Sequence, residues 1–228
     1  MVYIRLFITL FTLLGAIGAA RAETWRLASI EWPPYAGAQL PDQGLAVNVL
    51  RTALAERGIT LEVDFMPWNR AVQRAKQGRY IGYFPAWPEE VEPGFVASGE
   101  VATSTVGLIS YRGSGVVWRG LEKALAYYRT GLVSSYVYSP EISAQLRTQP
   151  KNLRYVASDR DLIRVLHHKR VVLALTDPRL VEYYAALDGY DNLEVVRQEL
   201  EVKPLVVALT DSQANRAQIT LLKALFDH

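Results

Sequence analysis

Short runs rich in β-branched and aromatic residues alternate with amphipathic stretches of helical period along most of the chain. This order is typical of sheets whose parallel strands are joined by crossover helices. In the first half we expect strands at 24–30, 59–65 and 80–84, and helices at 44–57 and 68–76. Val47, Leu50 and Leu54 fall on one face of the first of these helices. The pattern predicts a βαβαβ unit and an α/β fold.

The second half repeats the pattern, with recognisable helix starts. Strands are expected at 131–134, 153–156, 171–176 and 193–196, followed by a late run at 203–209. Ser139, Ser158 and Asp177 are suitable N-caps, and the first and last of them precede a proline. A Thr-x-x-Gln sequence at 210–213 is expected to open a last helix that runs through Phe226.

No long Gly/Ser linker separates the two halves, so two units would be joined by strands that pass directly between them. The runs 106–111 and 202–209 are the candidates. Two small α/β units fit better than one large sheet. We expect lobe 1 to comprise 23–108 plus 209–228 and lobe 2 to comprise 109–208. Two crossing strands make a hinge with a cleft beside it.

The N-terminal 22 residues have the pattern of a secretory signal peptide. Met1 to Arg5 is short and basic, Leu6 to Ala19 is almost wholly apolar, and Ala20-Arg21-Ala22 is an A-x-A cleavage site. The apolar run is about 14 residues long, whereas roughly 20 are needed to cross a bilayer. A retained membrane anchor is the alternative. We expect a cleaved signal and a periplasmic protein.

Removal of this segment changes the charge of the chain. It takes away two basic residues and no acid, which leaves 228 − 22 = 206 residues with 23 basic and 23 acidic side chains and a formal net charge of 0. Because no basic excess or Lys/Arg block remains to neutralise phosphates, we expect no nucleic-acid partner. The chain has no Cys, so an exported form must rely on its buried core rather than on disulfides.

Several short motifs occur in a suggestive order. They are Glu31-Trp32-Pro33-Pro34-Tyr35, a helix start near Gly44-Leu45, Pro67-Trp68-Asn69-Arg70-Ala71, and Gln77-Gly78 before a strand. Together they resemble bacterial extracellular solute-binding protein family 3, the amino-acid-type periplasmic binding proteins. The resemblance runs over most of residues 24–226 and is strongest over 24–112. It implies a type II fold, in which two lobes close on a small solute.

Two departures from that family bear on the ligand. Where Ser98 is aligned with the family's ligand-binding serine, Glu89 and Glu90 stand where a Thr-x-x-Arg segment would place the arginine that grips the ligand carboxylate. An apolar residue, Ile81, also replaces the family's acid in the Gly-x-x-Asp sequence that begins at Gly78. The resemblance therefore implies a divergent member without the usual carboxylate clamp.

A cleft that captures a small solute needs aromatic surfaces and a few placed polar groups. Our candidate ligand-binding residues are Tyr35, Trp68, Arg70, Trp87, Ser98, Ser135, Tyr136 and Asp177. No catalytic residue, metal ligand or cofactor is predicted. Trp32 either contacts the ligand or lies half in the core, and we expect the core position. Glu89 and Glu90 either receive an ammonium group or simply solvate their loop, and we expect them to be solvated.

Each candidate has a structural alternative. A cation at a helix start, such as Arg70, makes sense if an anion lies beside it, and that anion is either a ligand group or the carboxylate of Glu62 or Asp64. Asp177 either meets a ligand amino group, as the resemblance implies, or only caps its helix. Ser135 and Tyr136 follow a strand and form either part of an anion-receiving nest or a plain turn.

The predicted function is capture of a small polar or zwitterionic solute, amino-acid-like or a small organic acid, between two lobes. A monomer is expected, with an inner-membrane ABC permease as a candidate partner. One alternative is an orphan accessory or sensor module of the same fold with no transport role. A lyase or dehydratase that uses Glu89, Glu90 or Asp177 is a further alternative, but the chain offers no assembled nucleophile or metal motif for it. We therefore expect no enzyme.

Overall fold

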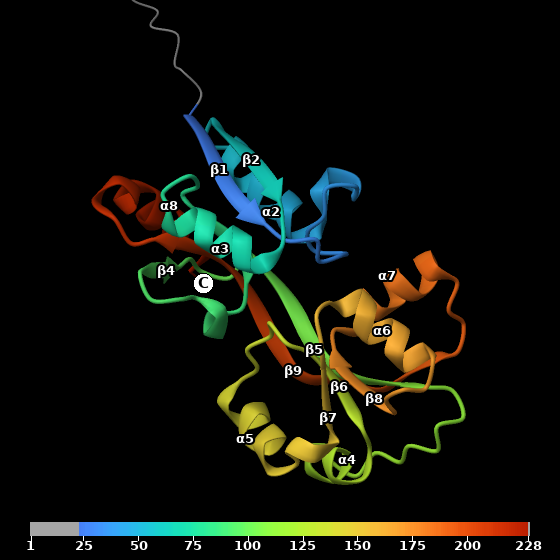
Figure 1. The fold of residues 1–228 in the computed structure, drawn as a ribbon. Helices are drawn as coiled ribbons and strands as arrows, with labels where there is room; N and C mark the ends of the chain where they lie inside the picture. Colours follow the sequence, from blue (N-terminus) through green and yellow to red (C-terminus); the bar gives the residue numbers. More distant parts are fainter. Residues whose placement is uncertain (1–22, 228) are drawn as a thin grey trace, which may run out of the picture.

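The computed structural model describes residues 23–227, so the predicted signal peptide at 1–22 lies outside the described residues. Figure 1 shows two lobes connected by a pair of long strands. No helix within residues 23–227 is both long enough and apolar enough to cross a membrane. The two-lobed α/β architecture expected from the sequence is present.

Lobe 1 is built on the first half of the chain and is completed by the C-terminus. Its strands are β1 (Glu23–Ser29), β2 (Ile59–Phe65), β3 (Gly82–Ala86) and β4 (Phe95–Ala97). Its helices are α2 (Leu45–Ala55), α3 (Trp68–Lys76) and α8 (Arg216–Phe226), with 3-10 turns η1 (Pro41–Gln43), η2 (Pro88–Glu90) and η4 (Gln213–Asn215). β1 pairs with β2 and β3 in parallel, and the register aligns Leu27 with Val63 and with Gly82. The predicted βαβαβ unit is confirmed.

Lobe 2 is also built of strands and helices that alternate along the chain. Its strands are β6 (Thr130–Val133), β7 (Leu153–Val156) and β8 (Leu173–Thr176). Its helices are α4 (Leu121–Tyr127), α5 (Pro140–Thr148), α6 (Asp159–His167) and α7 (Pro178–Asp188), with the 3-10 turn η3 (Pro150–Asn152). Ser139, Ser158 and Asp177 each cap the helix predicted for them by accepting a backbone N–H. These caps explain why the helix starts could be read from sequence.

Two strands cross between the lobes: β5 (Ala102–Tyr111) and β9 (Leu193–Thr210). They pair antiparallel along most of β5, with a register shift between Val106 and Leu108. At one end β9 pairs with β3 and β4, and at the other β5 pairs with β8, so strand pairing continues from β2 to β7 in the order β2-β1-β3-β9-β5-β8-β6-β7. Figure 1 shows both strands running from one lobe into the other.

The glycine at the register shift of β5 shows how closely the crossing is packed. A Cβ at Gly107 would lie 2.6 Å from Pro178 Cγ and 2.8 Å from the carbonyl oxygens of Arg197 and Gln198. No side chain fits at this distance without a shift of the backbone, so the crossing requires glycine here.

Some predicted elements were wrong. β3 begins at Gly82 rather than Tyr80, because its pairing with β1 starts at the Leu27–Gly82 register. The separate runs 193–196 and 203–209 form one strand, β9, because β5 pairs with both of them. Thr210 does not open the last helix, since it ends β9 opposite Phe95, and Ser212 caps the following turn instead. The strand β4 and the helix α4 were not predicted.

Candidate ligand-binding site

A groove lies between the lobes. Its volume is about 550 Å³, and it is lined by Ile30, Glu31, Phe65, Met66, Pro67, Trp68, Asn69, Val133, Ser134, Ser135, Tyr136, Ala157, Ser158, Asp159 and Tyr184. Lobe 1 supplies the residues up to Asn69, from the ends of β1 and β2 and the start of α3. Lobe 2 supplies the others, from the ends of β6 and β7, the start of α6, and α7. A solute in this groove would contact both lobes.

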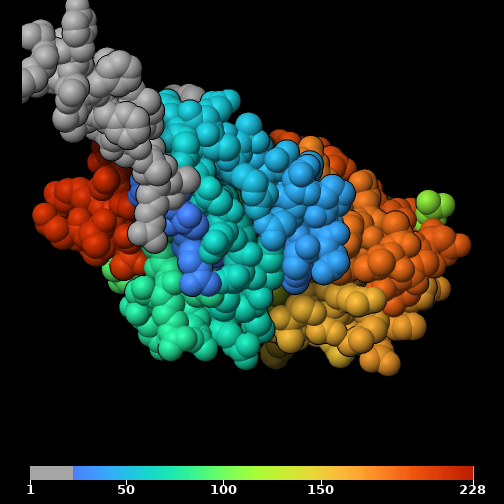
Figure 2. All heavy atoms as spheres, turned by 90° about the horizontal axis from the view of Figure 1, so that it is seen from above, coloured from blue at the N-terminus to red at the C-terminus, as the bar shows by residue number. Residues whose placement is uncertain are grey.

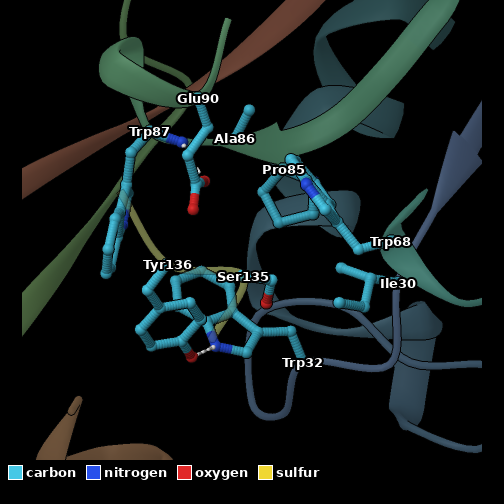
Figure 3. A pocket seen from close by; sticks show the side chains of 9 residues that line it. All are labelled: Ile30, Trp32, Trp68, Pro85, Ala86, Trp87, Glu90, Ser135 and Tyr136. Atoms are coloured by element: carbon cyan, nitrogen blue, oxygen red, sulfur yellow. Dashed lines mark hydrogen bonds between the residues drawn. The ribbon is translucent and has the colours of Figure 1, made fainter. Parts of the chain in front are cut away.

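A small inner pocket continues the groove toward the hinge. It is lined by Ile30, Trp32, Trp68, Pro85, Ala86, Trp87, Glu90, Ser135 and Tyr136, and four of these residues also line the groove. Its volume of about 20 Å³ is on the order of the space needed by one water molecule. Figure 3 shows the carboxylate of Glu90 pointing into this space, with Trp87 on one side and Pro85 on the other.

Aromatic side chains from both lobes meet at the inner pocket. The Trp32 Nε1–H donates to Tyr136 Oη at 2.6 Å, across the lobe boundary, as Figure 3 shows. Tyr136 in turn donates to Asp159 Oδ1 at 2.8 Å. The ring centroids of Trp87 and Tyr136 lie 4.9 Å apart, within the range of favourable aromatic pairs. These contacts place an aromatic wall at the hinge end of the groove.

A second contact between the lobes joins Tyr35 and Asp177. The Tyr35 hydroxyl donates to Asp177 Oδ2 at 2.7 Å, and both residues are buried. Burial, reinforced by the Asp177 carboxylate, raises the pKa of Tyr35 well above its usual value. Figure 2 shows the blue segment before α2, which follows Tyr35, lying against the orange part of lobe 2 that contains α7.

The loop that carries Trp32 and Tyr35 is held in place by close backbone packing. Gly44 has a φ of 106°, and a Cβ at that position would lie 2.5 Å from the Tyr35 carbonyl oxygen. The Ala46 N–H donates to the same oxygen at 3.0 Å. Only glycine fits there, so Gly44 allows the start of α2 to hold the loop of Tyr35.

Two carboxyl groups at the site have raised pKa values. Burial raises the pKa of Glu90 to about 7, with the N–H of Trp87 and the charge of Lys203 opposing the shift. Burial also raises the pKa of Asp159 to about 6, although the hydroxyls of Tyr136 and Thr176 donate to it and lower it. Both groups therefore titrate near neutral pH in the folded protein.

Four of the predicted ligand-binding residues line the groove or the inner pocket: Trp68, Trp87, Ser135 and Tyr136. Two more, Tyr35 and Asp177, bond each other and line neither. Asp177 Oδ1 caps α7 by accepting the Arg179 N–H, while Oδ2 also accepts the Thr105 N–H. Both of its oxygens are therefore engaged within the protein. Ligand contact by any of these residues stays a prediction.

The other two predicted residues lie away from the groove. Ser98 is buried in lobe 1, where its hydroxyl donates to Gly99 O and accepts from the Val207 N–H. Arg70 is exposed on α3 and lines neither space. Its alternative assignment, an ion pair with Glu62 or Asp64, is wrong, because both carboxylates pair with Arg26 and Arg70 forms no ion pair within residues 23–227. A substitute clamp at Arg70 therefore has no geometric support here.

Several lining residues were missed in the sequence. Asp159, Tyr184 and Glu31 line the groove but were not candidates. Trp32 and Glu90 line the inner pocket, although ligand contact was only the alternative to a core position for Trp32 and to a solvated position for Glu90. The position of Asp159 directly after the Ser158 cap of α6 was the available signal, because helix starts after parallel strands face the crevice of α/β proteins. Tyr184 lies inside a helix, and nothing local distinguishes it.

The lining combines aromatic rings, hydroxyls and carboxylates. Within residues 23–227 no three His, Asp or Glu side chains gather closely enough to hold a metal ion. The groove can desolvate a small molecule against Trp and Tyr rings and orient it with hydroxyls and carboxylates.

Comparison with known proteins bears on the fold. No protein-family model matches the chain, and no curated protein matches it. Solved structures do. A histidine kinase sensor domain with similarity to periplasmic binding proteins is 17% identical, with 91% of this chain and 90% of that chain covered and a TM-score of 0.74.

Two further solved structures are similar over nearly their whole length. The GluR0 ligand-binding core in complex with L-glutamate is 16% identical, with 92% of each chain covered and a TM-score of 0.70. The second Venus flytrap domain of BvgS from Bordetella pertussis is 12% identical, with 90% of this chain and 87% of that chain covered and a TM-score of 0.72. At such identities the similarity shows the fold alone: the chain has the two-lobed Venus flytrap fold of periplasmic-binding-protein-like domains.

Proposed function

We propose that the protein is a periplasmic solute-binding protein that captures a small polar solute in the groove between its lobes. One observation carries the proposal: residues of both lobes line a single groove. A solute bound there favours the closed arrangement in proportion to its higher affinity for it. Similarity to solved binding domains of the same fold supports the proposal. We further propose a divergent membership of solute-binding protein family 3 and delivery of the solute to an inner-membrane ABC permease.

A thermal-shift screen of the processed chain tests solute binding. The panel contains amino acids, opines, polyamines and small carboxylates. We expect at least one compound to raise the midpoint of unfolding by several degrees, because a ligand that binds only the folded state stabilises it by mass action. The variant Trp68→Ala, which removes a ring shared by the groove and the inner pocket, should abolish the shift. Absence of a shift across the panel would contradict the proposal.

A sensor or accessory module without a transport role is the second candidate. The observation that favours it is the pair of direct hydrogen bonds between the lobes, Trp32–Tyr136 and Tyr35–Asp177, which join the lobes through the protein's own side chains. A sensor domain and a BvgS domain also share the fold. If no compound shifts the midpoint, and deletion of the gene leaves uptake of every compound in the panel unchanged, this candidate replaces the first.

We propose that the protein binds its solute without converting it. Mass spectrometry of a bound compound after prolonged incubation with the protein should return it unchanged. Conversion of the compound would instead support an enzyme that uses the carboxyls of Glu90 or Asp159.

Periplasmic export is proposed from the N-terminal sequence pattern. Expression of the whole chain should yield a periplasmic form whose first residue is Glu23, as read by N-terminal sequencing. A protein that stays in the membrane fraction with residues 1–22 attached would favour the retained anchor.

A further inference from the structure

The charged side chains around the groove are all of one sign. Glu31 and Asp159 line the groove, and Glu90 lines the inner pocket. No Lys, Arg or His is among the described residues that line either space. A ligand carboxylate placed there would meet carboxylates and no cation.

Two basic residues close to these carboxylates, Lys203 near Glu90 and Arg160 next to Asp159, pair with other acids. Lys203 Nζ pairs with Glu89 Oε2 at 2.6 Å and lies over the Trp87 ring, 5.1 Å from its centroid. Arg160, which follows Asp159 in α6, is exposed and pairs with Asp188. Neither cation lines the groove or the inner pocket, so neither offers a positive group to a solute.

The three lining carboxylates are oriented by neutral donors. Asp159 Oδ1 accepts the hydroxyls of Tyr136 and Thr176, and Glu90 Oε2 accepts the Trp87 N–H. Glu31 accepts the Ala38 N–H. Within residues 23–227 none of the three forms an ion pair. Asp159 is buried, Glu90 is half-buried and Glu31 is exposed. Since a carboxylate taken out of water is costly without a compensating cation, a cationic ligand would stabilise the ionised forms of Asp159 and Glu90.

The rest of the lining suits the same kind of ligand. Trp32, Trp68, Trp87, Tyr136 and Tyr184 present aromatic rings to the two spaces. Such rings attract ammonium groups through the negative face of the π system. Carboxylates at both the inner pocket and the outer groove, with aromatic surface between them, match an ammonium group on an apolar body.

We infer that the groove selects organic ammonium compounds that lack a carboxylate, such as alkyl diamines. This inference rests on the proposed solute-binding function and names the class of solute. Amino acids with a free carboxylate bind more weakly, because the lining carboxylates repel that group and no arginine or lysine receives it.

Calorimetric titration of the processed chain with matched probes tests the inference. The probes are putrescine, its uncharged analogue butanediol, choline, L-arginine and L-glutamate. We expect putrescine or choline to bind at least about tenfold more tightly than L-glutamate, and putrescine to bind at least about tenfold more tightly than butanediol, since charge-assisted hydrogen bonds are among the stronger ones.

Variants assign the binding to the named carboxylates. Asp159→Asn and Glu90→Gln keep the shape and the hydrogen-bond acceptor of each side chain, and each should weaken the better-binding amine about tenfold or more. Asp161→Asn is the matched control, because Asp161 lies in the same first turn of α6, pairs with Arg164 and lines neither space. It should leave the affinity unchanged. Far-UV circular dichroism verifies that every variant folds.

The outcomes separate this inference from the proposed function. Tighter binding of L-glutamate than of either amine would overturn the inference and leave solute binding standing. Amine binding that neither Asp159→Asn nor Glu90→Gln weakens would overturn the assignment to this groove. If no probe binds but the thermal-shift panel yields another ligand that has a carboxylate, the inference also fails. If nothing binds in either experiment, the proposed function itself fails.

Discussion

At the scale of single residues, Asp177 shows how a predicted ligand contact becomes an internal one. Its carboxylate caps α7 and also accepts the Thr105 N–H and the Tyr35 hydroxyl. Tyr35 belongs to lobe 1 and Asp177 to lobe 2, so one side chain fixes the start of a helix and joins the lobes. A buried acceptor with three donors has little capacity left for a solute.

Tyr35→Phe tests this joint. Removal of the hydroxyl leaves a buried carboxylate oxygen with one donor fewer, so the free energy of unfolding should fall by about 1 to 2 kcal/mol, measured by urea denaturation. The control is Tyr155→Phe, because Tyr155 is 60% exposed and its change should stay within about 0.5 kcal/mol. Equal effects of the two changes would show that the hydrogen bond of Tyr35 contributes nothing.

Glu90 gives stability a pH dependence of definite sign. Its pKa in the folded protein is about 7, above its ordinary value of 4.5, so the folded state holds the proton more tightly than the unfolded state. Stability from this group is present at low pH and is lost as pH rises from about 4.5 to about 7. The nearby charge of Lys203 opposes the shift, and that of Glu89 reinforces it.

Urea denaturation of the protein and of Glu90→Gln at pH 4.5 and pH 7.5 measures this contribution. The variant should lose less stability between the two pH values, by a difference on the order of 3 kcal/mol at most. If both proteins lost the same unfolding free energy between the two pH values, Glu90 would ionise about as readily in the folded protein as in the unfolded chain.

At the scale of elements, β9 contributes a buried cation, Lys203, where it crosses between the lobes. The Lys203 side chain is 2% exposed and pairs with Glu89 of η2 at 2.6 Å and with Glu201 at 3.8 Å. Ser104 of β5 accepts the Trp87 Nε1–H and donates to the Lys203 carbonyl oxygen. The loop after β3, which supplies Trp87 and Glu90 to the site, is thereby attached to both crossing strands.

Glu89→Gln should destabilise the protein by about 2 kcal/mol, because it removes the closest partner of a buried charge. The double variant Glu89→Gln with Lys203→Met should recover most of that loss, since the buried cation that lost its closest partner is then also removed, although Glu201 loses its weaker contact with Lys203. Glu92→Gln is the matched control: Glu92 pairs with Lys76 on the surface, where both side chains are more than a third exposed, and its change should cost less than about 1 kcal/mol. Chemical denaturation of the four proteins measures these differences. A double variant less stable than Glu89→Gln would contradict this account.

At the scale of the whole molecule, continuous strand pairing couples the two lobes. β5 and β9 belong to both lobes, so neither can unfold without breaking strands of the other. We therefore expect one cooperative transition in urea. Four of the five tryptophans, Trp25, Trp32, Trp68 and Trp87, lie in lobe 1, so fluorescence reports mainly on that lobe.

Far-UV circular dichroism reports on both lobes, and its urea midpoint should coincide with the fluorescence midpoint. A fluorescence transition that comes clearly earlier or later would show that the lobes unfold independently. Gly107→Ala should lower both midpoints together, because a Cβ there collides with the backbone of β9 at the crossing.

Local patterns were enough to predict most of the elements. The periods of the helices, the caps at Ser139, Ser158 and Asp177, and the β-rich runs act over a few residues. Even the two crossing strands could be located, because no linker separates the halves. The errors lie where pairing between strands sets the end of an element. At Thr210, for example, β9 continues because β4 pairs with it.

The sequence by itself determined the α/β class and the helix starts at Ser139, Ser158 and Asp177, since each depends on the preferences of short segments, and the absence of a linker indicated two lobes joined by strands. Only the tertiary structure decided which side chains line the groove. Glu31, Asp159 and Tyr184 come together from distant segments, and Asp177 is occupied by a tyrosine 142 positions away. Such contacts depend on how two lobes close, and no local spacing carries that information. That is why Arg70 looked suited to a ligand in the sequence, while acidic and aromatic side chains line the groove in the structure.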